Sequence, residues 1–295
     1  SGSLTLSLTG LFSVSLIGAV LSILINPLLA KNLSPEDYAI IGYFTSFNLL
    51  ISPLINFSFI QYYSKRYFEV SETEREDLKK TLTFSLLFFS LIISLLVLSG
   101  IFIYFRISDV SFPFFPFALL AVFTHLFSNL FNLRLVESKM QRRSNYFFRL
   151  TIMNSAIGVV YALVLVVAVK LGAFGRLSAS FLSSLTVFLI IISITKVRLN
   201  YNRDQFLAAL KFCWPLTAAA SLNYFFNGYD RLMLEKLNDT HNFGLYNVAA
   251  QITAYLVIFN TAIRNTFQPD IYEQIAKRNI RRLVKVVLVI IALSS

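Results

Sequence analysis

The stretch Thr81–Phe105, TLTFSLLFFSLIISLLVLSGIFIYF, carries no charged side chain along its whole length. A helix needs about 20 apolar residues to cross a hydrocarbon core of roughly 30 Å. Inside lipid the backbone has no water to bond, and a helix satisfies its own N–H and C=O groups. This stretch therefore predicts a transmembrane helix.

Seven further apolar blocks of similar length follow the same rule. They are Leu4–Leu29, Tyr38–Tyr63, Phe112–Val136, Leu150–Val169, Leu177–Thr195, Phe212–Leu234 and Phe243–Phe267. A ninth block begins near Leu283 and is still apolar at the last residue, so we expect a C-terminally truncated part of a longer chain. The predicted fold is an all-α integral membrane bundle with eight full transmembrane helices and the start of another.

The composition agrees with a membrane protein and excludes several other classes. Only 14% of the 295 residues are charged, whereas soluble domains are about a quarter charged. The net charge of +11 comes from basic residues in short loops, which argues against a nucleic-acid surface. The single cysteine, Cys213, excludes an internal disulfide. No metal or cofactor motif is visible, so no cofactor is predicted.

The basic residues also predict how the chain is oriented. The loops after even-numbered spans hold 18 Lys and Arg, and the loops after odd-numbered spans hold 5. Basic loops stay in the cytoplasm. We therefore expect the even-numbered loops and the N-terminus of this multi-pass protein to be cytoplasmic.

A short internal repeat joins the two parts of the chain. The segment LAKNLSPEDYAI at 29–40 resembles LEKLNDTHNFGL at 234–245. Each segment leaves an odd-numbered span and enters the next one. Six spans separate the two copies, so they have the same orientation, as in the parallel repeats of some transporters.

Polar side chains recur at helical spacing within the predicted spans. Residues three, four or seven positions apart share a helix face. Such groups are costly in lipid unless they face a cavity or a partner, and amides that join helices are the alternative reading. We expect a wet cavity for sugar hydroxyls, which need donors and acceptors together. The candidate residues are Asn26, Asn48, Asn56, His125, Asn129, Asn132, Asn223 and Asn227.

Four charged residues within or beside the spans carry more specific hypotheses. Arg134 and Arg264 lie near the cytoplasmic ends of the fourth and eighth predicted spans. Guanidinium groups bind phosphate in a bidentate way, so together these two arginines could form a phosphate-binding mouth. Simple snorkelling to the interface is the alternative. Asp230 and Arg231 lie near the external end of the seventh span. We interpret them as an outer gate, with a structural salt bridge as the alternative.

Two stretches carry a family resemblance. LAKNLSPEDY at 29–38 resembles the first external loop of polysaccharide transporters of the multidrug/oligosaccharidyl-lipid/polysaccharide exporter superfamily. YDRLML at 229–234, followed by FGLY at 243–246, resembles their seventh span and next helix. The resemblance implies two six-helix lobes around a central cavity. Residues 1–200 would form the N-terminal lobe, and 201–295 the beginning of the C-terminal lobe.

The resemblance also implies a function. Members of this family flip polyprenyl-diphosphate-linked oligosaccharides to the outer leaflet, as precursors of surface polysaccharides such as the O-antigen of lipopolysaccharide. The implied partners are the lipid-linked oligosaccharide, membrane lipids, and polysaccharide polymerase and other assembly proteins. The protein would then be a transporter and not an enzyme.

Two alternatives are open at this point. A cation-coupled drug exporter of the same superfamily would need an acidic cavity site, and Asp230 is the main acidic candidate within a span. A membrane enzyme, such as a polymerase or ligase acting on the same lipid-linked sugars, would need a sizeable external loop. All the predicted external loops are short.

Overall fold

The computed structural model describes residues 25–108, 110–195, 199–237 and 239–294. Helices make up 85% of the structure, and no strand occurs in these ranges. The prediction of an all-α fold is therefore confirmed. Most of the first predicted span, Leu4–Leu29, lies outside these ranges, although residues 25–30 are helical.

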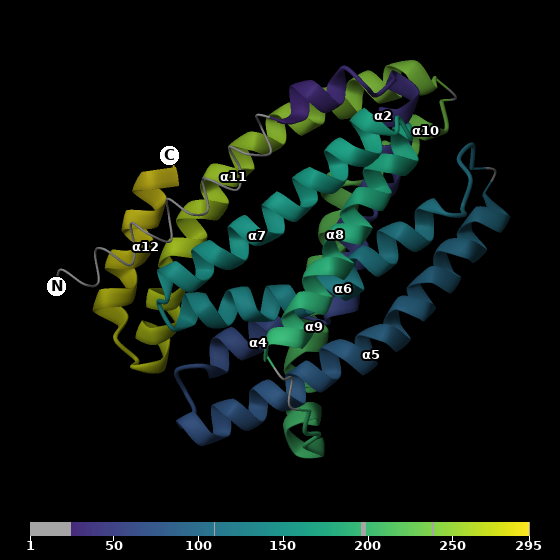
Figure 1. The fold of residues 1–295 in the computed structure, drawn as a ribbon. Coiled ribbons are helices and arrows are strands. Elements are labelled where there is room, and N and C mark those ends of the chain that lie inside the picture. Colours follow the sequence, from purple (N-terminus) through teal and green to yellow (C-terminus); the bar gives the residue numbers. More distant parts are fainter. Residues whose placement is uncertain (1–24, 109, 196–198, 238, 295) are drawn as a thin grey trace.

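Long helices run back and forth through the molecule (Figure 1). In chain order they are α2 (Pro35–Ser46), α3 (Asn48–Asn56), α4 (Phe59–Arg66), α5 (Glu72–Ile107), α6 (Phe117–Met140), α7 (Ser144–Ala162) with a π-helical turn at Leu163–Ala168, α8 (Gly172–Thr195), α9 (Arg203–Asn227), α10 (Tyr229–Glu235), α11 (Thr240–Ala276) and α12 (Ile280–Ser294). We call the end of the bundle where α5, α7 and α9 begin the basic end, because the basic loops lie there. The other end is the opposite end.

Five helical stretches of the described residues are long and apolar enough to cross a membrane. They are Pro35–Asn56, Glu72–Ile107, Phe117–Met140, Ser144–Ala168 and Gly172–Thr195. These stretches correspond to the second to sixth predicted spans. Their outward side chains agree with this assignment, since Ile92, Leu96 and Ile103 of α5 are more than half exposed, as lipid-facing residues are.

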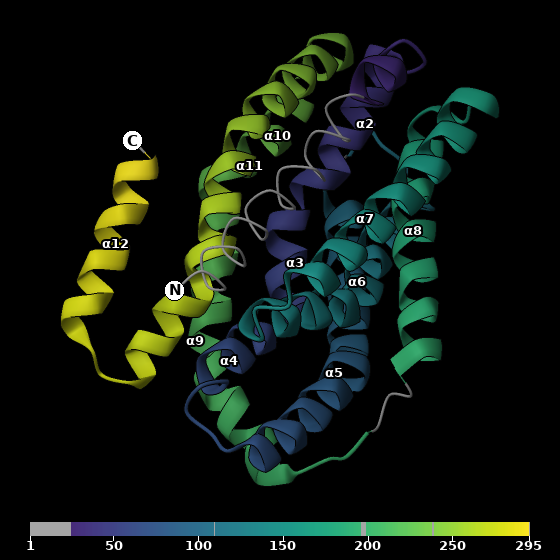
Figure 2. The same ribbon diagram turned by 60° about the vertical axis from the view of Figure 1, so that its left-hand side comes forward.

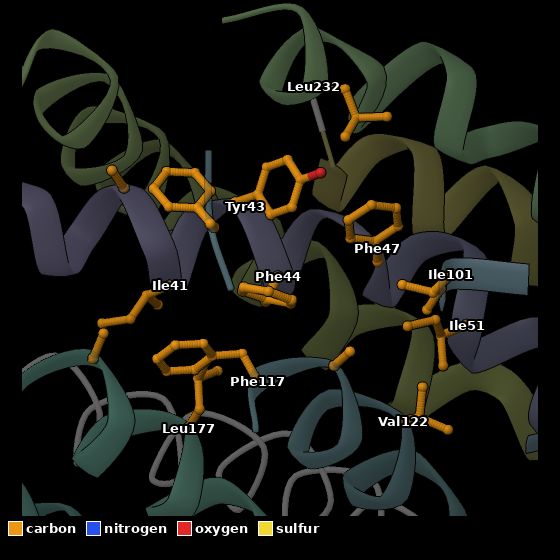
Figure 3. Close-up of a cluster of buried hydrophobic side chains, with 14 of the residues drawn as sticks. Ile41, Tyr43, Phe44, Phe47, Ile51, Ile101, Phe117, Val122, Leu177 and Leu232 are labelled. Atoms are coloured by element: carbon orange, nitrogen blue, oxygen red, sulfur yellow. The ribbon is translucent and has the colours of Figure 1, made fainter. Parts of the chain in front are cut away.

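The short helix α2 lies at the centre of the largest apolar cluster. Tyr43 and Phe44 are completely or almost completely buried. The cluster also contains residues from seven other helices, among them Ile101 of α5, Phe117 of α6 and Leu232 of α10 (Figure 3). Since α2 contacts both the α5–α8 part and the α10–α11 part of the chain, it connects the two.

The helix α2 packs closely against the first turns of α11, at the top of the molecule in Figure 2. Two glycines permit this approach. A Cβ added to Gly42 would overlap the side chain of Asn247, and a Cβ added to Gly244 would overlap the backbone carbonyl of Pro35. Small residues let helix backbones approach closely in membrane proteins, and this crossing uses one from each helix.

The two copies of the sequence repeat meet at this crossing. Ser34 and Asp239 occupy the same position in the repeat, and each caps its helix by accepting the N–H of the third residue along, at 3.1 Å in both cases. Gly42 and Asn247 also occupy equivalent positions, 205 residues apart, and they contact each other. A contact between equivalent residues is expected when an approximate two-fold axis relates two repeats.

The second predicted span, Tyr38–Tyr63, is broken into α2, α3 and α4 instead of being continuous. Pro53 lies within α3 and has no N–H to donate. Phe57 and Ser58 then adopt left-handed backbone conformations that end the helix. The Ser58 carbonyl accepts the Tyr62 N–H at the start of α4, at 3.1 Å, and also a hydrogen bond from the thiol of Cys213 on α9, at 3.4 Å.

The fourth and seventh predicted spans also differ from the helices observed. The helix α6 begins at Phe117 instead of Phe112, because Pro113 and Pro116 interrupt the segment before it. The seventh span divides into α9 and α10 at Gly228, whose backbone is not helical. A Cβ at this position would lie 3.2 Å from the carbonyl oxygen of Ser46 on α2, so glycine permits a close approach.

The acidic and basic segment before the third predicted span belongs to the same helix as the span. Ser71 begins α5 with a capping box that includes Glu74, and the charged residues form the first turns of the long helix. The reciprocal bonds of a capping box satisfy backbone N–H groups at the helix start. Charge and lipid-facing segments therefore share one continuous helix.

We predict that Gly244→Ala destabilises the protein. A methyl group there would overlap the Pro35 backbone, and overpacking of this kind costs about 1–3 kcal/mol. Thermal unfolding of the purified protein in detergent would show a lower midpoint. Gly100→Ala on α5 is the matched control, because a Cβ there meets nothing within 4 Å. Equal midpoints for the two variants would contradict the close crossing.

Candidate functional site

A polar cavity of about 280 Å³ lies among the segment before α2 and the helices α6, α7 and α8. Its polar lining consists of hydroxyl and amide groups and one guanidinium. These residues are Asn26, Thr124, Asn154, Ser155, Arg176, Ser180, Ser183 and Ser184. Ile25, Leu29, Val159 and Ala162 complete the wall. The cavity therefore offers many neutral donors and acceptors with a single positive charge.

Acidic side chains are absent from the described lining of this cavity. The preceding segment, residues 1–24, contains no Asp or Glu in its sequence either, so it cannot supply one. Asp37, an acid in the first turn of α2, accepts the backbone N–H of Ala173 at 2.7 Å and the N–H of Ser34 at 3.0 Å. It ties the start of α2 to the start of α8.

Sequence reasoning found only Asn26 among the cavity residues. Arg176 was counted with the loop before the sixth span, because that span was predicted to begin at Leu177. The helix α8 begins at Gly172, which brings Arg176 into its first turns. Arg176, Ser180 and Ser183 then follow at spacings of four and three, the helical spacing that defines one face. A correct helix start would have revealed this stripe.

The other predicted cavity residues are distributed over several helices. Asn129 is buried on α6, and its amide nitrogen has no hydrogen-bond partner in the described residues; the same holds for Nε2 of His125 one turn earlier. Asn56 caps the break after α3 by accepting the N–H of Ser58 at 2.8 Å. Asn48 and Asn132 are half-buried, and Asn223 is exposed. The side chain of Asn227 lies outside the described residues.

The predicted gate residues lie on α10 at the opposite end. Asp230 accepts a hydrogen bond from the hydroxyl of Tyr246 on α11. No ion pair joins Asp230 to Arg231 in the part of the chain that the structure describes. The carboxylate therefore links α10 to α11, and the gate function stays a prediction.

Arg134 belongs to a compact charge cluster near the basic end. It donates to Glu137 at 2.9 Å, and the same carboxylate accepts from Lys79 of α5 at 2.9 Å. The side chains of Arg134 and Glu137 are 12% and 11% exposed, so both charges are largely buried and depend on their partners. The side chain of Arg264 lies outside the described residues, so the phosphate-binding mouth stays a prediction.

A second polar cluster joins α6 to α11 at the basic end. Lys139 donates to Asn265 and Gln268, both at 3.0 Å. Arg142, in the turn after α6, donates through one nitrogen to Asp270 at 2.6 Å and to Glu273 at 2.7 Å. We call these contacts the α6–α11 clasp. They join residues about 130 positions apart, and sequence reasoning had counted Lys139 and Arg142 only as loop charges.

Comparison with known proteins places the chain in a family. Residues 7–269 match the family model described as polysaccharide biosynthesis protein. The chain belongs to the polysaccharide biosynthesis protein family. The resemblance seen at 29–38 and 229–246 is therefore confirmed. No curated protein matches the chain.

The chain also shares its fold with solved transporter structures. The chain resembles a mutant MATE protein (TM-score 0.72, 14% identity, 97% of this chain and 69% of that one). It also resembles a MOP-superfamily transporter from Pyrococcus furiosus, described by the reverse polarity of its binding pocket (TM-score 0.70, 15% identity, 97% of this chain and 68% of that one). A third match is the Vibrio cholerae MATE transporter VcmN in the bent form (TM-score 0.64, 13% identity, 97% of this chain and 71% of that one). At these identities the likeness shows a shared fold.

We predict that the α6–α11 clasp weakens at acidic pH. The hydrogen bond from Lys277, aided by the nearby Arg142, lowers the pKa of Glu273, which lies beyond the predicted eighth span. A carboxylate with a lowered pKa stabilises the contact fully at a pH above the usual Glu pKa, near 4.3. This stabilisation is lost as the pH falls through the lowered pKa, because the carboxylate becomes protonated.

Spin labels at Asn145→Cys and Ile275→Cys, both exposed positions, would measure the separation of the two elements by electron resonance. The distribution of distances between the two labels should broaden as the pH falls below about 4.3. In a Glu273→Gln background this step should disappear. A distance distribution that stays constant down to pH 3 in the parent protein would argue against this role of Glu273.

Proposed function

We propose that this protein carries a polyprenyl-diphosphate-linked oligosaccharide from the cytoplasmic to the outer leaflet of the bacterial inner membrane, for synthesis of a surface polysaccharide such as O-antigen. The observation that supports this best is the cavity of hydroxyls and amides with one arginine. Sugar hydroxyls both donate and accept hydrogen bonds, which matches such a lining. Its volume is near the lower limit of small-molecule pockets, which suits one part of a larger glycan.

The mechanism proposed is alternating access of two lobes, residues 1–200 and the beginning of the second at 201–295. The α2–α11 crossing lies at the opposite end, and the α6–α11 clasp lies at the basic end. Both involve α11, so a tilt of this helix relative to α2 and α6 would open one end while the other stays closed. Arg134 and Arg264 are proposed to meet the diphosphate at the cytoplasmic mouth.

The membrane potential could drive this movement without a nucleotide motor. The bacterial interior is electrically negative, so two negative charges that move outward gain about 4–5 kcal/mol per 100 mV. No Gly-x-x-x-x-Gly-Lys loop for nucleotide binding occurs in the sequence. Transport without ATP is therefore expected.

A cation-coupled drug exporter is the second candidate, because the solved structures that share the fold include MATE proteins. A cation in a cavity of low dielectric needs a nearby carboxylate. The described lining has none, which favours the anionic cargo. A lipid-linked-sugar polymerase or ligase has less support, because family and fold point to a transporter.

The direct test is a flipping assay in liposomes, with the whole protein and a labelled polyprenyl-diphosphate oligosaccharide. We expect protein-dependent movement of the sugar to the other leaflet without ATP. Movement of a cationic dye, with none of the sugar, would support the drug exporter. Extension of the sugar in the presence of an acceptor would support an enzyme.

We also predict that Arg176→Gln lowers the flipping rate at least tenfold, because the cavity loses its only described positive charge. One charged hydrogen bond contributes about 1.5–3 kcal/mol. Arg106→Gln is the matched control, since Arg106 is exposed at the same end of the bundle and lies over the ring of Phe102. If both variants flip the labelled oligosaccharide at the same rate, Arg176 does not bind the transported molecule.

A further inference from the structure

A second polar depression, outside the cavity, lies at the basic end of the bundle. Its volume is about 430 Å³, and it is formed by the turn between α6 and α7 and by the first turns of α7. Its lining residues are Arg142, Arg143, Ser144, Asn145, Tyr146 and Arg149. Three of the six are arginines and none is acidic. We call this depression the arginine pocket.

The arginine pocket lies where a membrane surface is expected. It follows directly on the helical stretch Phe117–Met140, and it lies at the start of the stretch Ser144–Ala168, both of which are long and apolar enough to cross a membrane. Tyr146 and Phe148 are 40% and 38% exposed there. Exposed aromatic residues beside a span are typical of the interface at the level of the lipid headgroups. A ligand in the pocket would therefore be at headgroup depth.

The donors in the arginine pocket are suited to an oxyanion with several acceptor oxygens. Arg143 and Arg149 are exposed, and neither forms a salt bridge among the described residues. Arg142 uses Nη2 for Asp270 and Glu273, while its buried Nη1 has no hydrogen-bond partner in the described part of the chain. Guanidinium groups bind phosphate through paired N–H donors.

We propose that the arginine pocket binds the phosphate of a membrane lipid at the cytoplasmic surface. Arg143 and Arg149 provide charge and donors from α7. Arg142, which is itself part of the α6–α11 clasp, provides a further donor. Ser144 and Asn145 supply neutral groups that can bond further phosphate oxygens. This site is separate from the cavity and does not depend on which molecule the protein transports.

The shared residue Arg142 links this site to the clasp. A phosphate on Arg142 brings negative charge close to Asp270 and Glu273, which are bound to the same guanidinium. Like charges repel, so lipid binding weakens the clasp, and a closed clasp weakens lipid binding to the same extent. The lipid would thus favour separation of α6 from α11 at the cytoplasmic end.

Calorimetric titration of the whole protein in a neutral detergent tests the site. The probes are short-chain phosphatidylglycerol, short-chain phosphatidylcholine and inorganic pyrophosphate. We expect phosphatidylglycerol to bind most tightly. Arg143→Gln together with Arg149→Gln should weaken its binding roughly 25-fold, about fivefold for each basic residue near a membrane surface.

A control variant separates the site from net charge. Arg281→Gln with Arg282→Gln removes the same two charges from exposed positions at the start of α12, and phosphatidylglycerol affinity should change less than twofold. If this control weakens binding as much as the Arg143/Arg149 pair, there is no specific site. Binding of pyrophosphate as tight as that of the lipid would overturn the assignment to a membrane lipid.

The link to the clasp has its own test. Asp270→Asn with Glu273→Gln removes the two competing carboxylates, so phosphatidylglycerol should bind several-fold more tightly. Unchanged or weaker binding would overturn the link. If the Arg143→Gln, Arg149→Gln double variant folds poorly, Arg149→Gln alone tests the site, because Arg149 is exposed and lies outside the clasp. This single variant should weaken phosphatidylglycerol binding about fivefold. All these readouts measure lipid binding and not transport, so failure here is distinguishable from failure of the proposed flipping activity.

Discussion

The close crossing of α2 and α11 is the constraint on which the described structure depends. Gly42 and Gly244 bring the two helices together, and equivalent residues of the repeat meet there. Because α2 is also the centre of the main apolar cluster, this contact connects the α5–α8 part of the bundle to the α10–α11 part. Within lipid there is little hydrophobic gain between helices, so close packing of this kind supplies the association energy.

Polar groups occur in three different arrangements, and each arrangement suits a different task. Hydroxyls and amides with one arginine surround a cavity. Charged pairs with short N···O distances join helices at the basic end. Three arginines line a depression at the basic end. The cost of polar groups in lipid favours such gatherings in cavities, ion pairs or helix ends.

The sequence predicted the all-α membrane fold, the family and the repeat, because apolar length and loop charge are strong local signals. It did not predict the breaks at Phe57–Ser58 and Gly228, since these depend on neighbours that satisfy or approach the backbone, Cys213 and Ser46. The arginine of the cavity was missed because one helix start was placed five residues late. The clasp joins distant residues such as Arg142 and Asp270, and no local pattern reveals such pairs.

We propose that the α2–α11 crossing parts during transport. A disulfide between Gly42→Cys and Asn247→Cys, with Cys213 replaced by Ala, would lock the crossing, since these two positions touch. We predict that the oxidised protein does not flip a polyprenyl-diphosphate oligosaccharide in liposomes and that a reductant restores flipping. Equal flipping rates in the fully oxidised and the reduced protein would contradict the account.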